Sequence, residues 1–276
     1  MENILSKKYL DDEFLELNKV YTNNDPFNHI VIDNFIRNEK LEKALSKINE
    51  IVKFDKLNYF DHNQKKKKIS TSEENLPNEF VELIRYFNSQ VFLNFLQKVT
   101  GIKEKLISDP YLWGGGLHTI SKGGFLKIHS DTNFHPDFKL DRRLNLLIYL
   151  NKDWKDSYGG NLELWDKDMK KCVKSIKPIF NRAVIFSTDD RSYHGHPDPL
   201  NCPEDLERRS IAFYYYSNGR SDVKTDFGKG TYFRQRLSNP KDYSIVVKNI
   251  FDAITPPIIN KIISKYILRR FVKRQK

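Results

Sequence analysis

Hydrophobic positions in the first third of the chain follow the spacing of helices. Within residues 38–51, apolar side chains recur every three or four positions, which predicts a helix with one buried face. Residues 80–99 repeat this pattern with a denser set of apolar side chains. Residues 30–35 begin with three apolar β-branched side chains and precede the first of these helices, which is typical of a short strand.

The pattern changes between residues 106 and 217, where short apolar runs alternate with turns rich in Gly, Asn and Asp. Several short strands at this spacing indicate a sandwich or a jelly roll. The predicted strands are residues 126–129, 144–150, 161–165, 172–176, 183–187 and 210–217. The polar residues 61–74 are expected to form an exposed loop that joins the helices.

These patterns divide the chain into three predicted regions. Residues 1–105 are expected to form a mainly helical support region, and residues 106–217 a β-rich core. Residues 218–276 are expected to form an extension that ends in a basic amphipathic helix. The predicted fold class is therefore α+β, with a jelly-roll core, N-terminal support helices and a C-terminal helix.

Charge is distributed unevenly over the 276 residues, whose formal net charge is +11. The lysines at positions 65–68 contribute four positive charges, and residues 256–276 contribute seven without any acid. The rest of the chain is neutral, which argues against a protein that coats nucleic acid. We interpret the lysine run as a solvated loop. The basic segment 256–276 fits a helix packed on the body, or a contact with an anionic membrane or an acidic partner.

Cysteine usage bears on the compartment. The chain has two cysteines, too few for a disulfide framework or a cysteine-rich zinc site. We therefore expect a reducing compartment and a cytoplasmic location.

The motif His-x-Asp occurs three times, and it suits a metal site because residues two apart on a strand project from the same face. It begins at His129, His135 and His196. The second and third copies contain proline, which suits a loop, whereas the first ends an alternating strand. His129 and Asp131 are therefore the preferred ligands. The third ligand is expected to be His194 or His196, which both follow the later apolar strand 183–187. Two imidazoles and one carboxylate are the ligand set of non-haem Fe(II) oxygenases.

An oxygenase of this kind that uses 2-oxoglutarate needs a buried cation for the distal carboxylate, and a guanidinium pairs with it through two hydrogen bonds. Arg208 and Arg209 begin a predicted strand, and alternation lets only one of them face inward. If Ile211, Phe213 and Tyr215 form the apolar face, Arg208 faces the pocket. Surface arginines at the start of a strand are the simpler alternative.

Several of these segments together resemble the prolyl 4-hydroxylase-type Fe(II)/2-oxoglutarate dioxygenases. The resemblance covers roughly residues 110–216, in the family's order, and is carried by residues 124–131, 143–154, 159–165, 181–187, 194–197 and 208–211. It implies a double-stranded β-helix in which His129, Asp131 and His194 bind Fe(II).

The same resemblance assigns the remaining pocket residues. It implies that Arg208 binds 2-oxoglutarate with help from Tyr149, and Asn145 shares the strand parity of Tyr149. It favours His194 over His196, because a proline usually follows the third ligand by three residues, here Pro197. The 14 residues from His194 to Arg208 exceed the family's usual spacing, which leaves the choice between Arg208 and Arg209 open.

The activity that the resemblance implies is hydroxylation of an aliphatic C–H bond, with Fe(II), 2-oxoglutarate and O₂. A prolyl residue of a protein or a proline-like compound is the expected substrate. Alternatives are a small molecule, a glycan or lipid precursor, or a catalytically silent jelly-roll binding module. The carboxylate of Asp131 argues against halogenation. Residues 210–217 lack the second arginine of the nucleic-acid demethylases, so no specific nucleic-acid partner is expected.

Overall fold

The computed structural model describes residues 4–6, 14–51, 55–56, 63–70, 72–223 and 230–236. Residues 1–233 form one compact unit, and residues 234–276 form a second. The predicted regions 1–105 and 106–217 both fall within the first unit. The predicted C-terminal helix, residues 256–276, lies outside the described residues.

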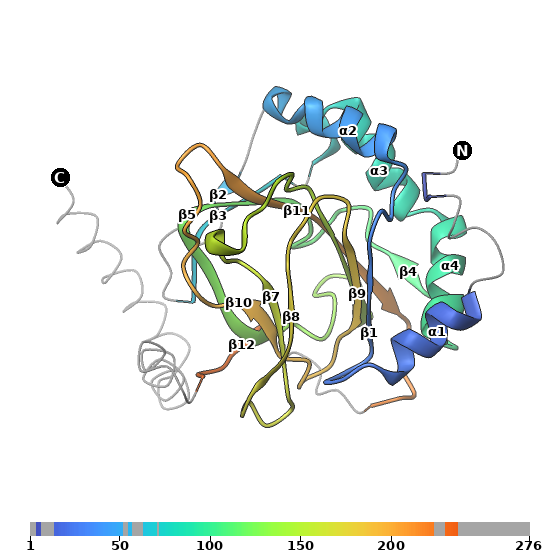
Figure 1. The fold of residues 1–276 in the computed structure, drawn as a ribbon. Helices are drawn as coiled ribbons and strands as arrows, with labels where there is room; N and C mark the ends of the chain where they lie inside the picture. Colours follow the sequence, from blue (N-terminus) through green and yellow to red (C-terminus); the bar gives the residue numbers. More distant parts are fainter. Residues whose placement is uncertain are drawn as a thin grey trace. The chain divides into compact units, whose positions relative to one another are not determined.

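In the first unit, the described residues include four α-helices, which gather on one side of a curled sheet (Figure 1). They are α1 (Phe14–Asn23), α2 (Asn38–Ser46), α3 (Asn78–Phe87) and α4 (Gln90–Thr100), with the short 3₁₀ turns η2 (Ile48–Glu50), η3 (Glu73–Asn75) and η4 (Asp156–Tyr158) between or after them. None of the helices in the described part of the chain is long and apolar enough to cross a bilayer.

The apolar run at residues 80–99 forms two helices rather than one. The chain breaks at Asn88 and Ser89, and the Ser89 hydroxyl accepts a hydrogen bond from the backbone N–H of Phe92 at 3.4 Å. A serine in this position satisfies a donor that has no partner inside the helix. The break lets Phe87 and Phe92 meet edge to face, with ring centroids 4.7 Å apart.

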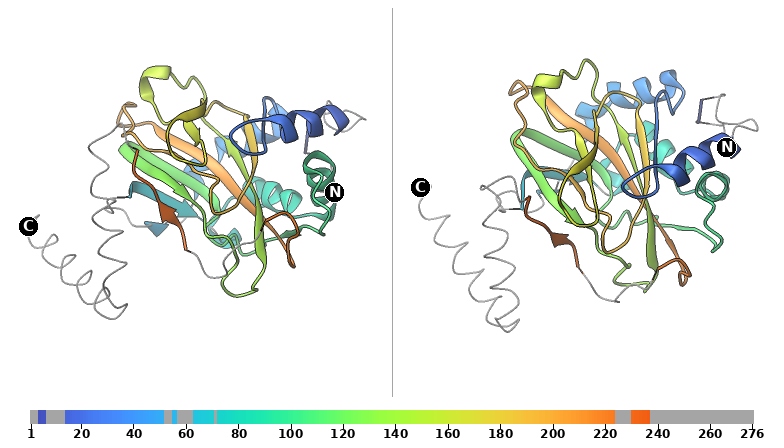
Figure 2. Two further views of the ribbon diagram at one scale, coloured as in Figure 1. Left: turned by 90° about the horizontal axis from the view of Figure 1, so that it is seen from below. Right: turned by 60° about the horizontal axis from the view of Figure 1, so that its bottom comes forward.

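The strands form one antiparallel sheet that curls into a jelly roll (Figure 2), which confirms the predicted α+β class. Along the sheet the order is β1-β9-β6-β11-β5-β10-β7-β8. The strands are β1 (His29–Ile32), β2 (Asp55–Lys56), β3 (Gln64–Ser70), β4 (Ile107–Ser108), β5 (Gly116–Ser130), β6 (Asp141–Tyr149), β7 (Leu162–Trp165), β8 (Cys172–Ile176), β9 (Ala183–Ser187), β10 (His194–His196), β11 (Glu207–Ser217) and β12 (Tyr232–Phe233).

Strand β5 joins the two halves of the curl. Its first half pairs with β11, and its second half pairs with β10. Between the halves lies Gly124, where an added Cβ would be 2.8 Å from the carbonyl oxygens of Lys65 and Ser121. Glycine is therefore needed for the close approach of backbone that lets one strand serve both halves.

The sheet has an outer face against the helices and an inner face. On β6 and β11 the outer residues are Leu144, Leu146, Ile148, Ile211, Phe213 and Tyr215, all in the main hydrophobic cluster. Phe213 meets Phe87 of α3 with ring centroids 5.1 Å apart. The predicted parity of β11 is thus confirmed, and the residues between these positions face inward.

The exposed loop predicted for residues 61–74 is wrong, because Gln64–Ser70 forms strand β3 along the edge of β5. Lys66 adopts φ +55° in a bulge, with Lys65 paired to Phe125 and Lys67 to Ile120. Lysine stems can lie along apolar surface, so a run of lysines conceals the alternation of a strand. The lysines at positions 65–68 are therefore part of the sheet and not a solvated loop.

Candidate functional site

The inner face brings together polar side chains from β6 and β11. On β6 and β11, Tyr149 lies opposite Ser210 and Asn145 lies opposite Tyr214. On β11 and β5, Arg208 lies opposite Ile120. Directly opposed residues of antiparallel strands share a face, so Asn145, Tyr149 and Arg208 all face the interior of the curl.

His129, Asp131 and His194 form a compact cluster at one end of this face. His194 on β10 lies opposite His129 on β5 in register, and Asp131 follows directly after β5. The Nε2 atom of His129 lies 3.4 Å from Asp131 Oδ1, and the Nε2 atom of His194 lies 3.4 Å from Asp131 Oδ2. The three ligand atoms all lie within 4.8 Å of one another. The group fits one metal ion.

Hydrogen bonds fix which nitrogen of each histidine is free. The Nδ1 atom of His129 donates to the carbonyl oxygen of Lys127 at 2.8 Å, and that of His194 donates to the carbonyl oxygen of Ser192 at 2.8 Å. Because Nδ1 carries the proton in each ring, the Nε2 lone pairs point at the carboxylate and are free for a metal. Burial lowers the pKa of His194 to about 4, so its ring is neutral at pH 7.

Two side chains hold the Asp131 carboxylate. Its Oδ2 accepts hydrogen bonds from Arg142 Nη2 at 3.1 Å and from Asn145 Nδ2 at 2.7 Å. Burial acts to raise the pKa of Asp131, but Arg142 and the two histidines of the cluster hold it well below its usual value. The Arg142 guanidinium in turn stacks 3.5 Å from the ring centroid of Tyr214.

Asn145 is thus hydrogen-bonded to Asp131 of the cluster. The sequence assigned Asn145 to the 2-oxoglutarate pocket, and the structure does place it on the inner face. Its Oδ1, however, accepts hydrogen bonds from Arg142 at 3.1 Å and 2.7 Å, and its amide donates to Asp131. Asn145 therefore orients the carboxylate of Asp131.

Arg208 provides a buried cation deeper in the curl, where it is 5% exposed. Its Nε donates to the Gly160 carbonyl oxygen at 2.7 Å, and its Nη2 lies 3.3 Å from the Tyr149 hydroxyl. Burial lowers the pKa of Arg208 and raises that of Tyr149. Among the described residues, no carboxylate forms an ion pair with Arg208, so an anionic ligand can pair with it.

Arg209 points elsewhere. Its Nη2 lies 3.3 Å from Glu207 Oε2, and Glu207 also pairs with Lys68 at 2.8 Å. The sequence left open whether Arg208 or Arg209 faces the pocket. Arg208 is the one that is buried beside Tyr149.

Lys67 is an inner-face residue that the sequence analysis missed. It lies opposite Ile120, which lies opposite Arg208, so the three form one row across β3, β5 and β11. Burial lowers the pKa of Lys67 to about 8; Asp131 opposes this shift, whereas Arg142 and Arg208 add to it. Within the described part of the chain its ammonium makes no hydrogen bond or ion pair. The available signal was Ile69, an apolar residue that shares the strand parity of Lys67.

His196 also lies in this pocket, but outside the cluster. It is 3% exposed, and neither ring nitrogen has a hydrogen-bond partner. Burial lowers its pKa well below the usual value, and the charges of Arg208 and Lys67 add to the effect. The group of potential metal ligands contains His194 and not His196.

Two other histidines are engaged elsewhere. His118 Nε2 donates to the carbonyl oxygens of Gly114 and Gly115 at 3.1 Å and 3.2 Å. His135 lies near Asp109, with Nε2 3.8 Å from the nearer carboxylate oxygen. The second His-x-Asp motif therefore does not contribute its histidine to the cluster.

Several known proteins are similar to this chain in sequence. Residues 115–216 match the family model of the 2OG-Fe(II) oxygenase superfamily. Prolyl 3-hydroxylase OGFOD1 of Mus musculus is 28% identical over 212 residues, which cover 74% of this chain and 35% of the relative. The Xenopus laevis protein of the same name is 27% identical over 179 residues, which cover 61% of this chain and 31% of the relative. The chain thus spans about a third of the length of these curated relatives.

Solved structures share the fold. A prolyl hydroxylase from Trichoplax adhaerens, in complex with a peptide fragment of the hypoxia inducible factor oxygen degradation domain, has a TM-score of 0.54 at 20% identity; the match covers 77% of this chain and 94% of that one. A prolyl 4-hydroxylase from Phytophthora capsici has a TM-score of 0.51 at 20% identity, and the match covers 79% of this chain and 67% of that one.

Proposed function

Residues 115–216 belong to the 2OG-Fe(II) oxygenase superfamily, and on this premise we propose that the protein hydroxylates a prolyl residue of a protein substrate, using Fe(II), 2-oxoglutarate and O₂. The observation that carries the proposal is the cluster of His129, Asp131 and His194 beside a buried Arg208 that has no carboxylate partner among the described residues. The names of the mouse and Xenopus relatives, and the peptide bound to the Trichoplax enzyme, support a prolyl residue of a protein as the substrate.

The donor set fits Fe(II). His129 and His194 would offer Nε2, and Asp131 would offer one carboxylate oxygen, all from one side, which leaves coordination positions for 2-oxoglutarate and O₂. The ion with these co-substrates supplies the oxidation, in which one oxygen atom enters the substrate and the other enters succinate as CO₂ leaves. Arg142 and Asn145 hold the Asp131 carboxylate in place through their hydrogen bonds to Oδ2.

Arg208 and its neighbours suit the distal carboxylate of 2-oxoglutarate. The Arg208 guanidinium is held by the Gly160 carbonyl and lies beside the Tyr149 hydroxyl, so a carboxylate can accept hydrogen bonds from both side chains. Lys67 adds a second positive charge in the same cross-strand row. The inner cluster that includes Tyr149, Leu164 and Phe186 keeps this side of the pocket apolar.

Succinate formation tests the proposal. The full chain is incubated with Fe(II), 2-oxoglutarate and proline-containing peptides, and the peptides are examined for the gain of one oxygen atom. His129→Ala and Asp131→Ala should lower succinate formation by at least about 100-fold. Asp168→Ala, which removes an exposed carboxylate between β7 and β8, should leave it unchanged. Equal turnover in all variants would contradict the proposal, and no turnover by the wild type would favour a catalytically silent binding module.

We also propose a cytoplasmic location and a peripheral contact through residues 256–276. Cys172 and Cys202 are both free thiols, which suits a reducing compartment.

The basic segment 256–276 would bind anionic lipid, and deletion of residues 256–276 should abolish sedimentation with phosphatidylserine vesicles. Equal sedimentation of the full and shortened chains would contradict this contact.

A further inference from the structure

Residues 197–206 connect β10 to β11, and backbone hydrogen bonds hold this segment against two other parts of the fold. The Leu200 N–H donates to the carbonyl oxygen of Gly124 at 3.0 Å, and the Leu200 carbonyl oxygen accepts from the Gly123 N–H at 2.8 Å. The N–H of the next residue donates to the Tyr158 carbonyl oxygen of η4 at 2.9 Å. The segment therefore has a fixed position beside β5.

The Leu200 side chain lies in a small hydrophobic cluster next to Arg208. Leu200 is 2% exposed, and the other buried members of the cluster are Ile120, Trp154 and Cys202. Ile120 lies on β5 directly opposite Arg208 on β11, and directly opposed residues share a face. The apolar cluster therefore borders the buried guanidinium.

Gly160 brings Leu200 and Arg208 together. It adopts φ +75°, and a Cβ added there would clash with Leu200 Cδ2 and would lie 3.0 Å from Arg208 Cδ and 3.3 Å from Arg208 Nε. The leucine methyl and the arginine stem thus occupy the same side of the Gly160 backbone. The Gly160 carbonyl oxygen also accepts the hydrogen bond from Arg208 Nε at 2.7 Å. Gly160 therefore holds Arg208, while Leu200 fills the space beside it.

This packing has a consequence for the length of the co-substrate. On the proposed function, one end of an oxo acid binds the metal and its distal carboxylate pairs with Arg208. The number of carbon atoms between the two ends then depends on how far the guanidinium can move away from the metal. Leu200 and Gly160 occupy the space into which Arg208 would move. A closely packed pocket of this kind discriminates by about 10-fold or more against one extra methylene.

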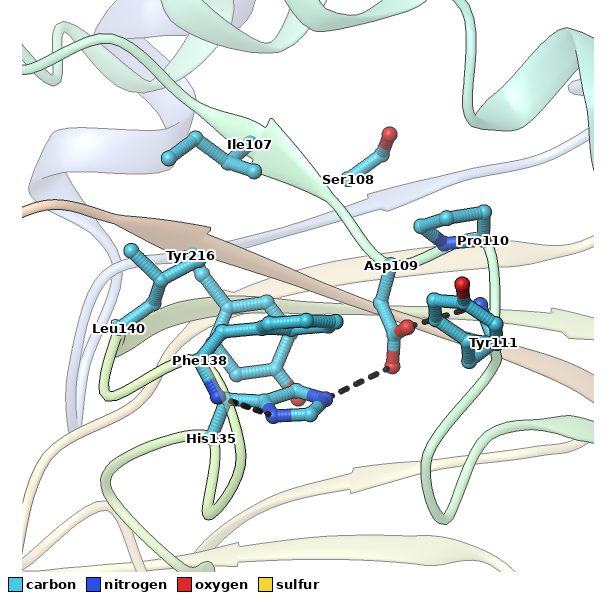
Figure 3. A pocket seen from close by; sticks show the side chains of 9 residues that line it. All are labelled: Ile107, Ser108, Asp109, Pro110, Tyr111, His135, Phe138, Leu140 and Tyr216. Atoms are coloured by element: carbon cyan, nitrogen blue, oxygen red, sulfur yellow. Dashed lines mark hydrogen bonds and ion pairs between the residues drawn. The ribbon is translucent and has the colours of Figure 1, made fainter.

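The cavity drawn in Figure 3 offers no extra room for a longer acid. Its volume is about 320 Å³, and its walls are residues 107–111, which include β4, together with part of the segment before β6 and Tyr216 of β11. Its lining includes neither Gly160, Leu200 nor Arg208. An additional methylene beside Arg208 would therefore have to displace the residues packed around that arginine.

We infer that Leu200 determines the chain length of the co-substrate. It restricts the pocket to the five-carbon acid 2-oxoglutarate and excludes its six-carbon homologue 2-oxoadipate. Leu200 acts through Arg208, whose position it fixes, and is therefore a positioning residue. The inference rests on the proposed function, since it requires an oxo acid between the metal and Arg208.

Calorimetric titration of the full, Mn(II)-loaded chain with 2-oxoglutarate and 2-oxoadipate tests this inference. The wild type should prefer 2-oxoglutarate by at least about 10-fold. Leu200→Ala, which shortens the side chain to a methyl group, should reduce the preference to about threefold or less. Leu200→Val should give an intermediate preference, and Leu200→Met, which conserves the volume, should retain that of the wild type. Leu206→Ala, at a 39% exposed position of the same segment, is the matched control and should also retain it.

Thermal unfolding establishes that each variant is folded, and Leu200→Val provides the test if Leu200→Ala does not fold. Equal binding of the two acids by the wild type would overturn the inference. The same preference in Leu200→Ala, Leu200→Val and wild type would also overturn it, even if both acids bound more weakly, because that is the result of a merely structural role. An equal reduction of the preference in Leu206→Ala would show that Leu200 has no special part in it.

The same measurements separate this inference from the proposed function. Binding of neither acid by the Mn(II)-loaded wild type would remove both. Binding of 2-oxoglutarate and formation of succinate that need His129, with a preference that does not depend on Leu200, would remove only the inference.

Discussion

Arg142 lies behind Asp131, with Nη2 3.1 Å from Oδ2, and the two side chains are only 4% and 12% exposed. The guanidinium therefore sets both the charge and the orientation of the carboxylate that would bind the metal. Removing one partner of a buried ion pair leaves the other charge uncompensated.

Arg142→Met should weaken metal binding without removing a ligand. Mutation of a residue that orients a metal ligand typically lowers metal affinity by about 10- to 100-fold, and we expect a loss in this range. Titration of the metal-free protein with Mn(II) measures it. Arg191→Met removes an exposed arginine and should bind Mn(II) as the wild type does. Unchanged affinity in Arg142→Met would show that Asp131 needs no support.

His194 and His196 should behave differently when each is replaced by alanine. His194→Ala removes an Nε2 ligand and should lower Mn(II) affinity by at least about 100-fold. His196→Ala should leave Mn(II) affinity within about threefold of the wild type, because its ring lies outside the ligand group. Reversed results in the same titration would assign the third ligand to His196.

Lys67→Met should weaken 2-oxoglutarate binding by about 10-fold. The Lys67 ammonium lies in the same cross-strand row as Arg208, so its positive charge can pair with the distal carboxylate. Calorimetry on the Mn(II)-loaded protein measures the affinity. Lys66→Met is the matched control, because the Lys66 ammonium donates a hydrogen bond to the carbonyl oxygen of Lys122 at 2.7 Å. A 2-oxoglutarate monoester that lacks the distal charge should bind Lys67→Met and the wild type with equal affinity. If the monoester shows the same difference, Lys67 does not act on the distal carboxylate.

Lys67 should also make the stability of the metal-free protein depend on pH. Its pKa is about 8 in the folded protein, against 10.5 for an ordinary lysine. Between these values the unfolded chain binds more protons, so the free energy of unfolding rises as pH increases from 8 to 10.5. The gain is up to about 3 kcal/mol at full burial and smaller for a half-buried ammonium. Urea unfolding at pH 7 and pH 10 should show this rise in wild type and Lys66→Met. A similar rise in Lys67→Met would contradict the assignment.

The sequence predicted the parts of the site that depend on local alternation. His129 and Asp131 end a strand with a regular pattern, and the apolar residues of β11 alternate, which places Arg208 inward. Both signals lie within a few residues of the side chain that they position, so neither requires knowledge of a neighbouring strand.

The sequence could not predict the parts that depend on distant pairing. Strand β3 is charged along most of its length, so the parity that Ile69 shares with Lys67 is a weak signal, and the pairing with β5 is what identifies Lys67 as the inward lysine. The role of Arg142 depends on the bulge after Tyr215, which belongs to another strand. His135 lies 3.8 Å from Asp109, 26 residues earlier in the chain, a contact that the His-x-Asp motif does not indicate.

Residues 132–141 begin directly after Asp131 and end directly before Arg142, the arginine that supports its carboxylate. A ligand that binds this segment and restricts it would therefore also restrict Asp131 and Arg142. Thermodynamic linkage then requires reciprocity: if such a ligand tightens metal binding by some factor, the metal must tighten binding of that ligand by the same factor.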